Sequence, residues 1–148
     1  MYFLSYVPYG ERCEFIRIAN QRDTKKIDIN RQEDAFMANQ TQEAQQRYKE
    51  YKKNQLENEI EEKRILDARA KHLSLEAKSL YEKVYSILND TEVTIREEYT
   101  LIHTIIYEAK FKAVVEASEF IPAKYFASTF GGLFVFHIHN NPFHCHYC

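Results

Sequence analysis

The chain has 148 residues and a formal net charge of −2, from 20 basic and 22 acidic residues. That length fits one domain of ordinary size, and the near balance of charge argues against a general nucleic-acid binder, which would show a basic face. Three cysteines are too few for a disulfide framework, and the first residues lack the pattern of a signal peptide. No uninterrupted apolar run reaches the roughly 18 residues of a membrane span. We therefore expect a cytoplasmic protein.

Residues 1–30 are rich in aromatic and β-branched side chains. The segment from Tyr2 to Val7 is followed by Pro8-Tyr9-Gly10, which can form a turn, and the segment from Glu14 to Ile18 partly alternates between polar and apolar residues. Such alternation is typical of a strand with one exposed face. The sequence therefore predicts two or three short strands here, a small β-meander that needs another element to lie against.

Residues 31–89 contain no glycine or proline and consist largely of good helix formers. Asn30 can cap the start of a helix, with Glu33 in the position of a capping box. In the second half of this segment the apolar residues are spaced alternately by four and three positions, as in a coiled-coil heptad. These residues are Leu66, Ala70, Leu73, Ala77, Leu80, Val84 and Ile87. The pattern predicts one long helix over about 31–89.

A second apolar stripe with helical spacing follows a turn at Asn89-Asp90-Thr91. Its members are Ile95, Tyr99, Ile102, Ile106, Ala109, Ala113, Ala117 and Phe120. The spacing predicts a helix over about 91–120, ended by Pro122, although residues 91–106 are also rich enough in β-branched residues for a strand. The two stripes are of similar length, so an antiparallel helical hairpin would bury both. The fold class we expect is mainly α, a coiled-coil-like hairpin over 31–120.

The first part of the long helix is left without an internal partner in this scheme. Over residues 31–62 the main large apolar side chains are Tyr48, Tyr51, Leu56 and Ile60, whose spacing does not keep to one face. An uncovered helix either binds another chain or frays in water. We therefore expect these four residues to bind a protein partner or a second copy. The neighbouring Lys49, Lys52 and Lys53 form a small basic patch that adjacent acidic residues weaken, so no specific nucleic acid is expected.

Residues 121–148 form an irregular C-terminal tail with two distinctive parts. Residues 125–136 carry no charge, which fits packing onto the hairpin or contact with a membrane surface. The final residues supply six nitrogen and sulfur ligands of the kind that bind zinc and related metals, although their spacing matches no established zinc motif. These candidate ligands are His137, His139, His144, Cys145, His146 and Cys148. The alternative, which the spacing favours, is a tail that binds metal only adventitiously or not at all, so no cofactor is expected beyond a possible zinc ion.

No motif in the sequence specifies a reaction. Three glycines cannot supply a dinucleotide-binding or phosphate-binding loop, and no His-Glu-x-x-His sequence is present. His72 and His103 are single histidines within the predicted helices. We expect a non-enzymatic helical interaction protein (an adaptor, a scaffold or an assembly component). The alternatives are a metal-binding protein that uses the tail, and a peripheral membrane protein held by residues 125–136.

Overall fold

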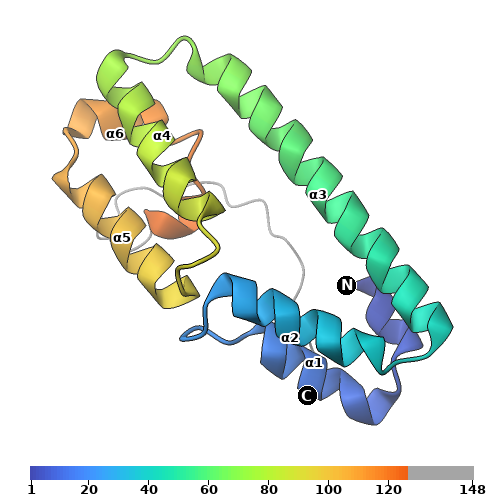
Figure 1. The fold of residues 1–148 in the computed structure, drawn as a ribbon. Helices are drawn as coiled ribbons and strands as arrows, with labels where there is room; N and C mark the ends of the chain where they lie inside the picture. Colours follow the sequence, from blue (N-terminus) through green and yellow to red (C-terminus); the bar gives the residue numbers. More distant parts are fainter. Residues whose placement is uncertain (127–148) are drawn as a thin grey trace. The chain divides into compact units, whose positions relative to one another are not determined.

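A computed structural model describes residues 1–126 of the chain, and these residues are mainly helical (Figure 1). In chain order the elements are the 3₁₀ turn η1 (Tyr2–Tyr6), α1 (Tyr9–Ala19), α2 (Lys26–Ala38), α3 (Gln42–Ala70), α4 (Leu75–Asn89), α5 (Ile95–Glu108), α6 (Phe111–Ala117) and the 3₁₀ turn η2 (Ala123–Tyr125). The predicted all-helical character of the middle of the chain is confirmed. The helices outnumber the two of the predicted hairpin.

The chain divides into two compact units. Unit 1 comprises Met1–Ala68 together with Thr91–Arg96. Unit 2 comprises Arg69–Asp90 together with the described residues from Glu97 onward. Each unit has its own apolar core.

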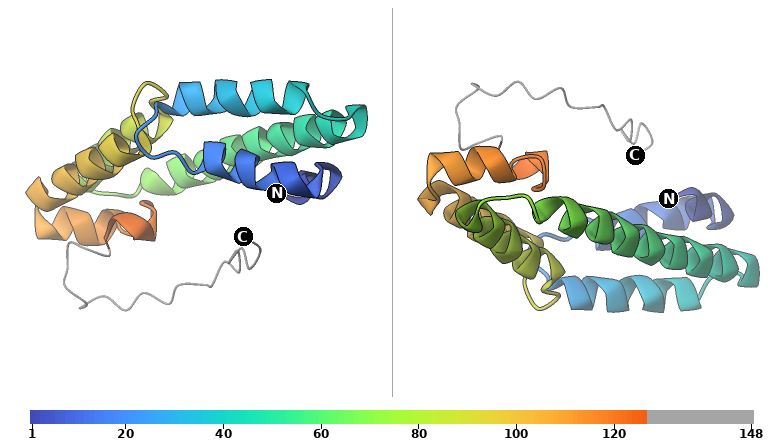
Figure 2. Two further views of the ribbon diagram at one scale, coloured as in Figure 1. Left: turned by 90° about the horizontal axis from the view of Figure 1, so that it is seen from below. Right: turned by 90° about the horizontal axis from the view of Figure 1, so that it is seen from above.

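In unit 1, α1 and α2 form an antiparallel pair, with η1 and the first turns of α3 beside them (Figure 2). Aromatic rings fill the space between these elements. The ring of Phe3 lies 5.3 Å from that of Phe15 and 5.2 Å from that of Tyr48, both edge to face. The buried apolar residues of this core are Phe3, Val7, Phe15, Met37, Ala44 and Tyr48. Residues far apart in the sequence are thus joined by edge-to-face aromatic contacts.

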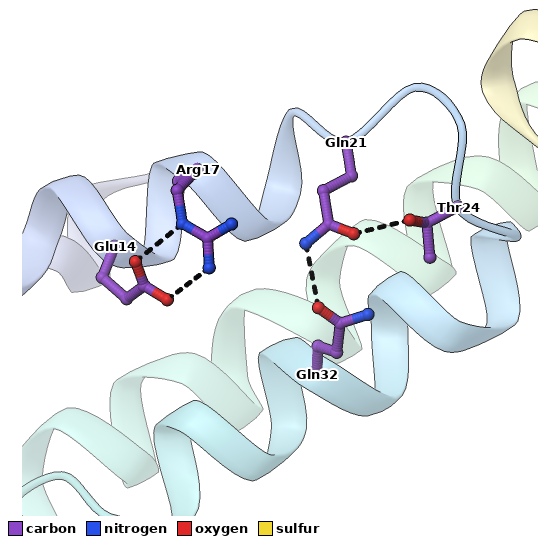
Figure 3. A network of polar contacts seen from close by, with 5 residues as sticks. All are labelled: Glu14, Arg17, Gln21, Thr24 and Gln32. Atoms are coloured by element: carbon purple, nitrogen blue, oxygen red, sulfur yellow. Dashed lines mark hydrogen bonds and ion pairs between the residues drawn. The ribbon is translucent and has the colours of Figure 1, made fainter.

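The predicted N-terminal β-meander is wrong. Residues 2–19 form η1 and α1, and across residues 1–126 the structure contains no strand beyond one isolated bridge between Lys25 and Thr94. Figure 3 shows a contact that fits the helix at its middle, where the guanidinium of Arg17 donates two hydrogen bonds, of 2.7 and 2.8 Å, to the carboxylate of Glu14. Residues three apart face each other on a helix but point to opposite sides of a strand. Burial of aromatic side chains against α3 outweighs the β propensity of this segment.

The predicted long helix over 31–89 starts earlier, at Lys26, so Asn30 lies inside α2 and does not cap its start. The helix is also interrupted twice, although it contains no glycine or proline. The first interruption follows Ala38, and Thr41 begins the next helix by accepting a hydrogen bond of 3.3 Å from the amide of Ala44. The second follows Ala70, and Ser74 caps α4 by accepting a bond of 3.3 Å from the amide of Ala77. Hydroxyl side chains that satisfy free amide groups are ordinary helix starts. The chain therefore turns at capping residues rather than at typical helix breakers.

The loop between α1 and α2 is held within unit 1 by the segment from Thr91 to Arg96. The amide of Lys26 donates to the carbonyl of Val93 at 3.1 Å, and the amide of Arg96 donates to the carbonyl of Arg22 at 3.0 Å. Ion pairs join Asp23 to Arg96, and Lys25 to Glu92. On the other side of the loop, the side-chain amide of Gln21 donates to that of Gln32 at 2.9 Å and accepts from Thr24 (Figure 3). These bonds fix the start of α2.

In unit 2, both apolar stripes predicted from the sequence contribute to one core. Residues from α4, α5, α6 and the segment after α6 are buried together. They are Ala77, Leu80, Val84, Ile102, Ile106, Ala113, Val114, Ala117, Ile121, Tyr125 and Phe126. The second predicted helix is divided, because α5 ends at Glu108 and α6 begins at Phe111. The change of direction lets α6 pack against α4.

Candidate interaction surface

The four predicted partner-binding residues lie on two different faces of α3. Tyr48 is only 6% exposed and Tyr51 is half-buried, whereas Leu56 and Ile60 are 58% and 61% exposed. At about 100° per residue, Tyr48 and Tyr51 face the core of unit 1, and Leu56 and Ile60 lie about 130° further around the helix on average. The first two therefore pack within the chain, and only the second two are presented on the surface.

Tyr48 is held by both its ring and its hydroxyl group. The ring lies 6.1 Å from that of Phe15, and the hydroxyl donates a hydrogen bond of 2.8 Å to the carboxylate of Asp34. Burial, reinforced by this bond, raises the pKa of Tyr48 well above its usual value. Beside it, the ammonium of Lys52 donates to Asn30 at 3.0 Å and lies 3.6 Å from the carboxylate of Glu33. These contacts tie residues 31–52 into unit 1.

Beyond Lys52 the environment of α3 changes. Every residue from 53 to 62 is exposed. The charges here pair along the helix itself: Lys53 lies 3.8 Å from Glu57, and Arg64 donates two bonds of 2.7 Å to Glu61. The hydrogen bonds from Arg64 lower the pKa of Glu61. These pairs favour the helix in water without burying Leu56 or Ile60. Within the expected 31–62 extension, the stretch that is exposed at every residue is therefore the last third, residues 53–62.

Two grooves offer alternatives to this surface. One, of about 560 Å³, lies in unit 1 over Met37 and Tyr48, beside Lys49 and Lys52. The other, of about 490 Å³, lies in unit 2 between α4, α5 and α6, where an ion pair joins Glu76 to Lys110. Its apolar lining residues are Leu75, Leu80, Ile105, Ala109 and Ala113. Both volumes suit a small ligand, but each groove carries both signs of charge and neither defines one ligand class.

A buried carboxylate in unit 2 was not predicted from the sequence. Glu98 is 7% exposed, accepts a hydrogen bond from the hydroxyl of Tyr125 and lies 3.6 Å from the ammonium of Lys124. Burial, together with the bond to Glu98, raises the pKa of Tyr125 well above its usual value. Nearby, the half-buried His103 stacks on Tyr99 with ring centres 6.1 Å apart. No local signal marks Glu98, since its partners come from a later segment.

The predicted metal ligands, His137, His139, His144, Cys145, His146 and Cys148, lie outside the described residues. Within residues 1–126, no three His, Cys, Asp or Glu side chains are grouped so that they could hold a metal ion. The predicted membrane-contacting segment 125–136 is described only at its start, where Tyr125 and Phe126 are buried in the core of unit 2. None of the helices described over residues 1–126 has the length and apolar character to cross a membrane.

No protein family model, curated protein or solved structure matches this chain. The arrangement of its own residues is therefore the basis for a proposed function.

Proposed function

We propose that the chain is a non-enzymatic helical interaction protein, an adaptor, scaffold or assembly component, which binds a protein partner through the exposed face of α3. The supporting observation is the exposure of Leu56 and Ile60, 58% and 61%, on a helix whose Tyr48 is only 6% exposed. One exposed aliphatic side chain is ordinary. Two that lie one turn apart, within a run where every residue is exposed, form an apolar strip that a second helix can cover.

Site-specific photocrosslinking tests this proposal in the organism that produces the chain. A benzoylphenylalanine at position 60 replaces one residue of the apolar strip, and the matched control carries it at position 62, which lies on the opposite side of the helix. We expect one adduct of defined mass from position 60 and none from position 62. We also expect Leu56→Ser to abolish that adduct, because it removes half of the strip. No adduct from position 60, or equal adducts from both positions, contradicts the proposal.

A further inference from the structure

The exposed strip of α3 belongs to a longer seam. From residue 49 onward, positions spaced alternately by four and three lie along one side of the helix, as the a and d positions of a coiled coil do. These positions hold Lys49, Lys53, Leu56, Ile60, Lys63 and Asp67. Only the central two are aliphatic, so the seam offers two apolar layers between charged ends.

The contacts that α3 makes inside its own chain leave this seam accessible. In the heptad that places Leu56 at d and Ile60 at a, Tyr48 falls at c, and Ala44 and Tyr51 fall at f. Ala44 and Tyr48 are buried in the core of unit 1 and Tyr51 packs against it. In a two-stranded coiled coil the c and f positions point away from the second helix. A second α3 can therefore lie along the seam without displacing the core of unit 1.

The charges beside the seam select the orientation of a second helix. Lys52 and Glu59 occupy g positions, and Glu57 and Arg64 occupy e positions. In a parallel pair, each g residue faces the e residue five positions later in the other chain. Lys52 then faces Glu57, and Glu59 faces Arg64, so both contacts are attractive. An antiparallel pair with Leu56 opposite Ile60 would instead bring Glu57 near Glu57 and Glu59 near Glu59, which is repulsive, and Glu50 near Arg64, which is attractive. Its flanking contacts are therefore of mixed sign, whereas those of the parallel pair are all attractive.

The cations of these pairs retain donors for a second chain. The Lys52 ammonium has three N–H groups, and Asn30 and Glu33 are its neighbours within the chain. The Arg64 guanidinium has five N–H groups, of which two donate to Glu61. Pairing across two chains can thus add to the pairs within each chain rather than replace them.

We propose that the exposed face of α3 binds a second copy of this chain in parallel register, with Leu56 against Leu56 and Ile60 against Ile60. This inference rests on the proposed function and names the partner of the same surface. Lysines at the neighbouring a and d positions place like charges near each other, which lowers the affinity. The dimer is therefore weak and depends on protein concentration.

Sedimentation velocity of the full-length chain over a range of concentrations tests the pairing. We expect the average mass to rise toward that of a dimer. Glu59→Lys turns an attractive contact into a repulsive one on both sides of the dimer, so we expect affinity to fall by about tenfold or more. The matched control Glu62→Lys makes the same charge change at an outward position and leaves affinity unchanged. Adding Arg64→Glu to Glu59→Lys restores the attraction and recovers most of the affinity.

Disulfide trapping tests the orientation. Cys13, Cys145 and Cys148 are first replaced by serine, and Lys53→Cys is then introduced at the seam. In a parallel dimer the two introduced thiols lie opposite each other, whereas in the antiparallel arrangement they lie about 15 Å apart along the helix axis. We expect rapid formation of disulfide-linked dimers in a glutathione buffer. Asn54→Cys, one position further along and off the seam, is the control and should link slowly.

Three outcomes overturn the inference. They are a chain that stays monomeric at every concentration, equal effects of Glu59→Lys and Glu62→Lys, and equal linking through positions 53 and 54. Far-UV circular dichroism of each variant confirms that its helical content is unchanged. A monomeric chain that crosslinks a different protein from position 60 overturns the dimer but leaves the proposed function standing. An adduct of twice the chain mass supports both.

Discussion

The hydroxyl of Tyr125 donates a hydrogen bond to the buried carboxylate of Glu98, which joins the end of the described chain to the first turn of α5. The same carboxylate lies 3.6 Å from the ammonium of Lys124. A buried carboxylate without its hydrogen-bond donor is costly, so this bond is expected to matter for the stability of unit 2.

Tyr125→Phe removes the donor and keeps the ring. We expect the free energy of unfolding to fall by about 1–3 kcal/mol, because the buried Glu98 loses a hydrogen bond in a site with little access to water. Urea denaturation followed by circular dichroism measures the change. Tyr107→Phe is the control, since the side chain of Tyr107 is exposed. An equal effect of the two substitutions would contradict a structural role for the bond.

Phe15→Ala tests whether the N-terminal segment packs as a helix against α3. The ring of Phe15 is buried beside those of Phe3 and Tyr48, so its removal leaves a cavity. We expect unfolding free energy to fall by about 3–5 kcal/mol. Tyr9→Ala, at an exposed position of the same helix, should change it by about 0.5 kcal/mol or less. A small effect at Phe15 would mean that α1 does not belong to the core of unit 1.

Ser74→Ala tests the interruption between α3 and α4. The Ser74 hydroxyl accepts a hydrogen bond from the amide of Ala77, so its loss should destabilise the chain by about 1 kcal/mol. Ser79→Ala makes the same change inside α4, where alanine favours the helix slightly. Thermal unfolding of both variants gives the comparison. If Ser74→Ala proves neutral or stabilising, Ser74 does not cap the start of α4 as the structure shows.

Glu33 gives a pH dependence with a definite sign. Burial raises the pKa of its carboxyl above 4.5, and Lys52 opposes this shift. A carboxyl whose pKa is raised by folding stabilises the fold below pH 4.5, and that contribution is lost as the pH rises through the folded pKa. We therefore expect Glu33→Gln to raise the stability at pH 7 relative to the parent chain and to lose this advantage at pH 4. Glu57→Gln, at an exposed position, should show no such trend.

The zinc hypothesis makes its own prediction. If the histidines and cysteines from His137 to Cys148 form a site, the full-length chain binds Zn²⁺ in isothermal titration, and replacing Cys145 and Cys148 by serine weakens the binding at least about tenfold. Competition with a chelator of known affinity distinguishes a specific zinc site from weak, nonspecific zinc binding. Equal weak binding by both chains would leave the tail with no specific metal role.

The sequence by itself determined the helical class of the middle of the chain and the buried stripes of α4 and α5. Leu80, Val84, Ile102 and Ile106 were predicted to be buried and are buried. The helical spacing of apolar residues predicts burial correctly at these positions, because the residues share one face of their helix and that face is covered as a whole. Thr41 and Ser74 are residue types that often cap helix starts, but without glycine or proline nearby the sequence did not predict an interruption at either position.

Only the tertiary structure decided which large side chains of α3 are covered. Tyr48 and Ile60 both lie among charged residues of one helix, yet Phe3 and Phe15 pack against Tyr48, and no described residue buries Ile60. The same aromatic contacts made residues 1–19 helical against their β propensity. Likewise, the buried carboxylate of Glu98 accepts its hydrogen bond from Tyr125, a residue far along the chain. Burial and hydrogen bonding between distant residues outweigh local preference, because they supply most of the free energy that orders the chain.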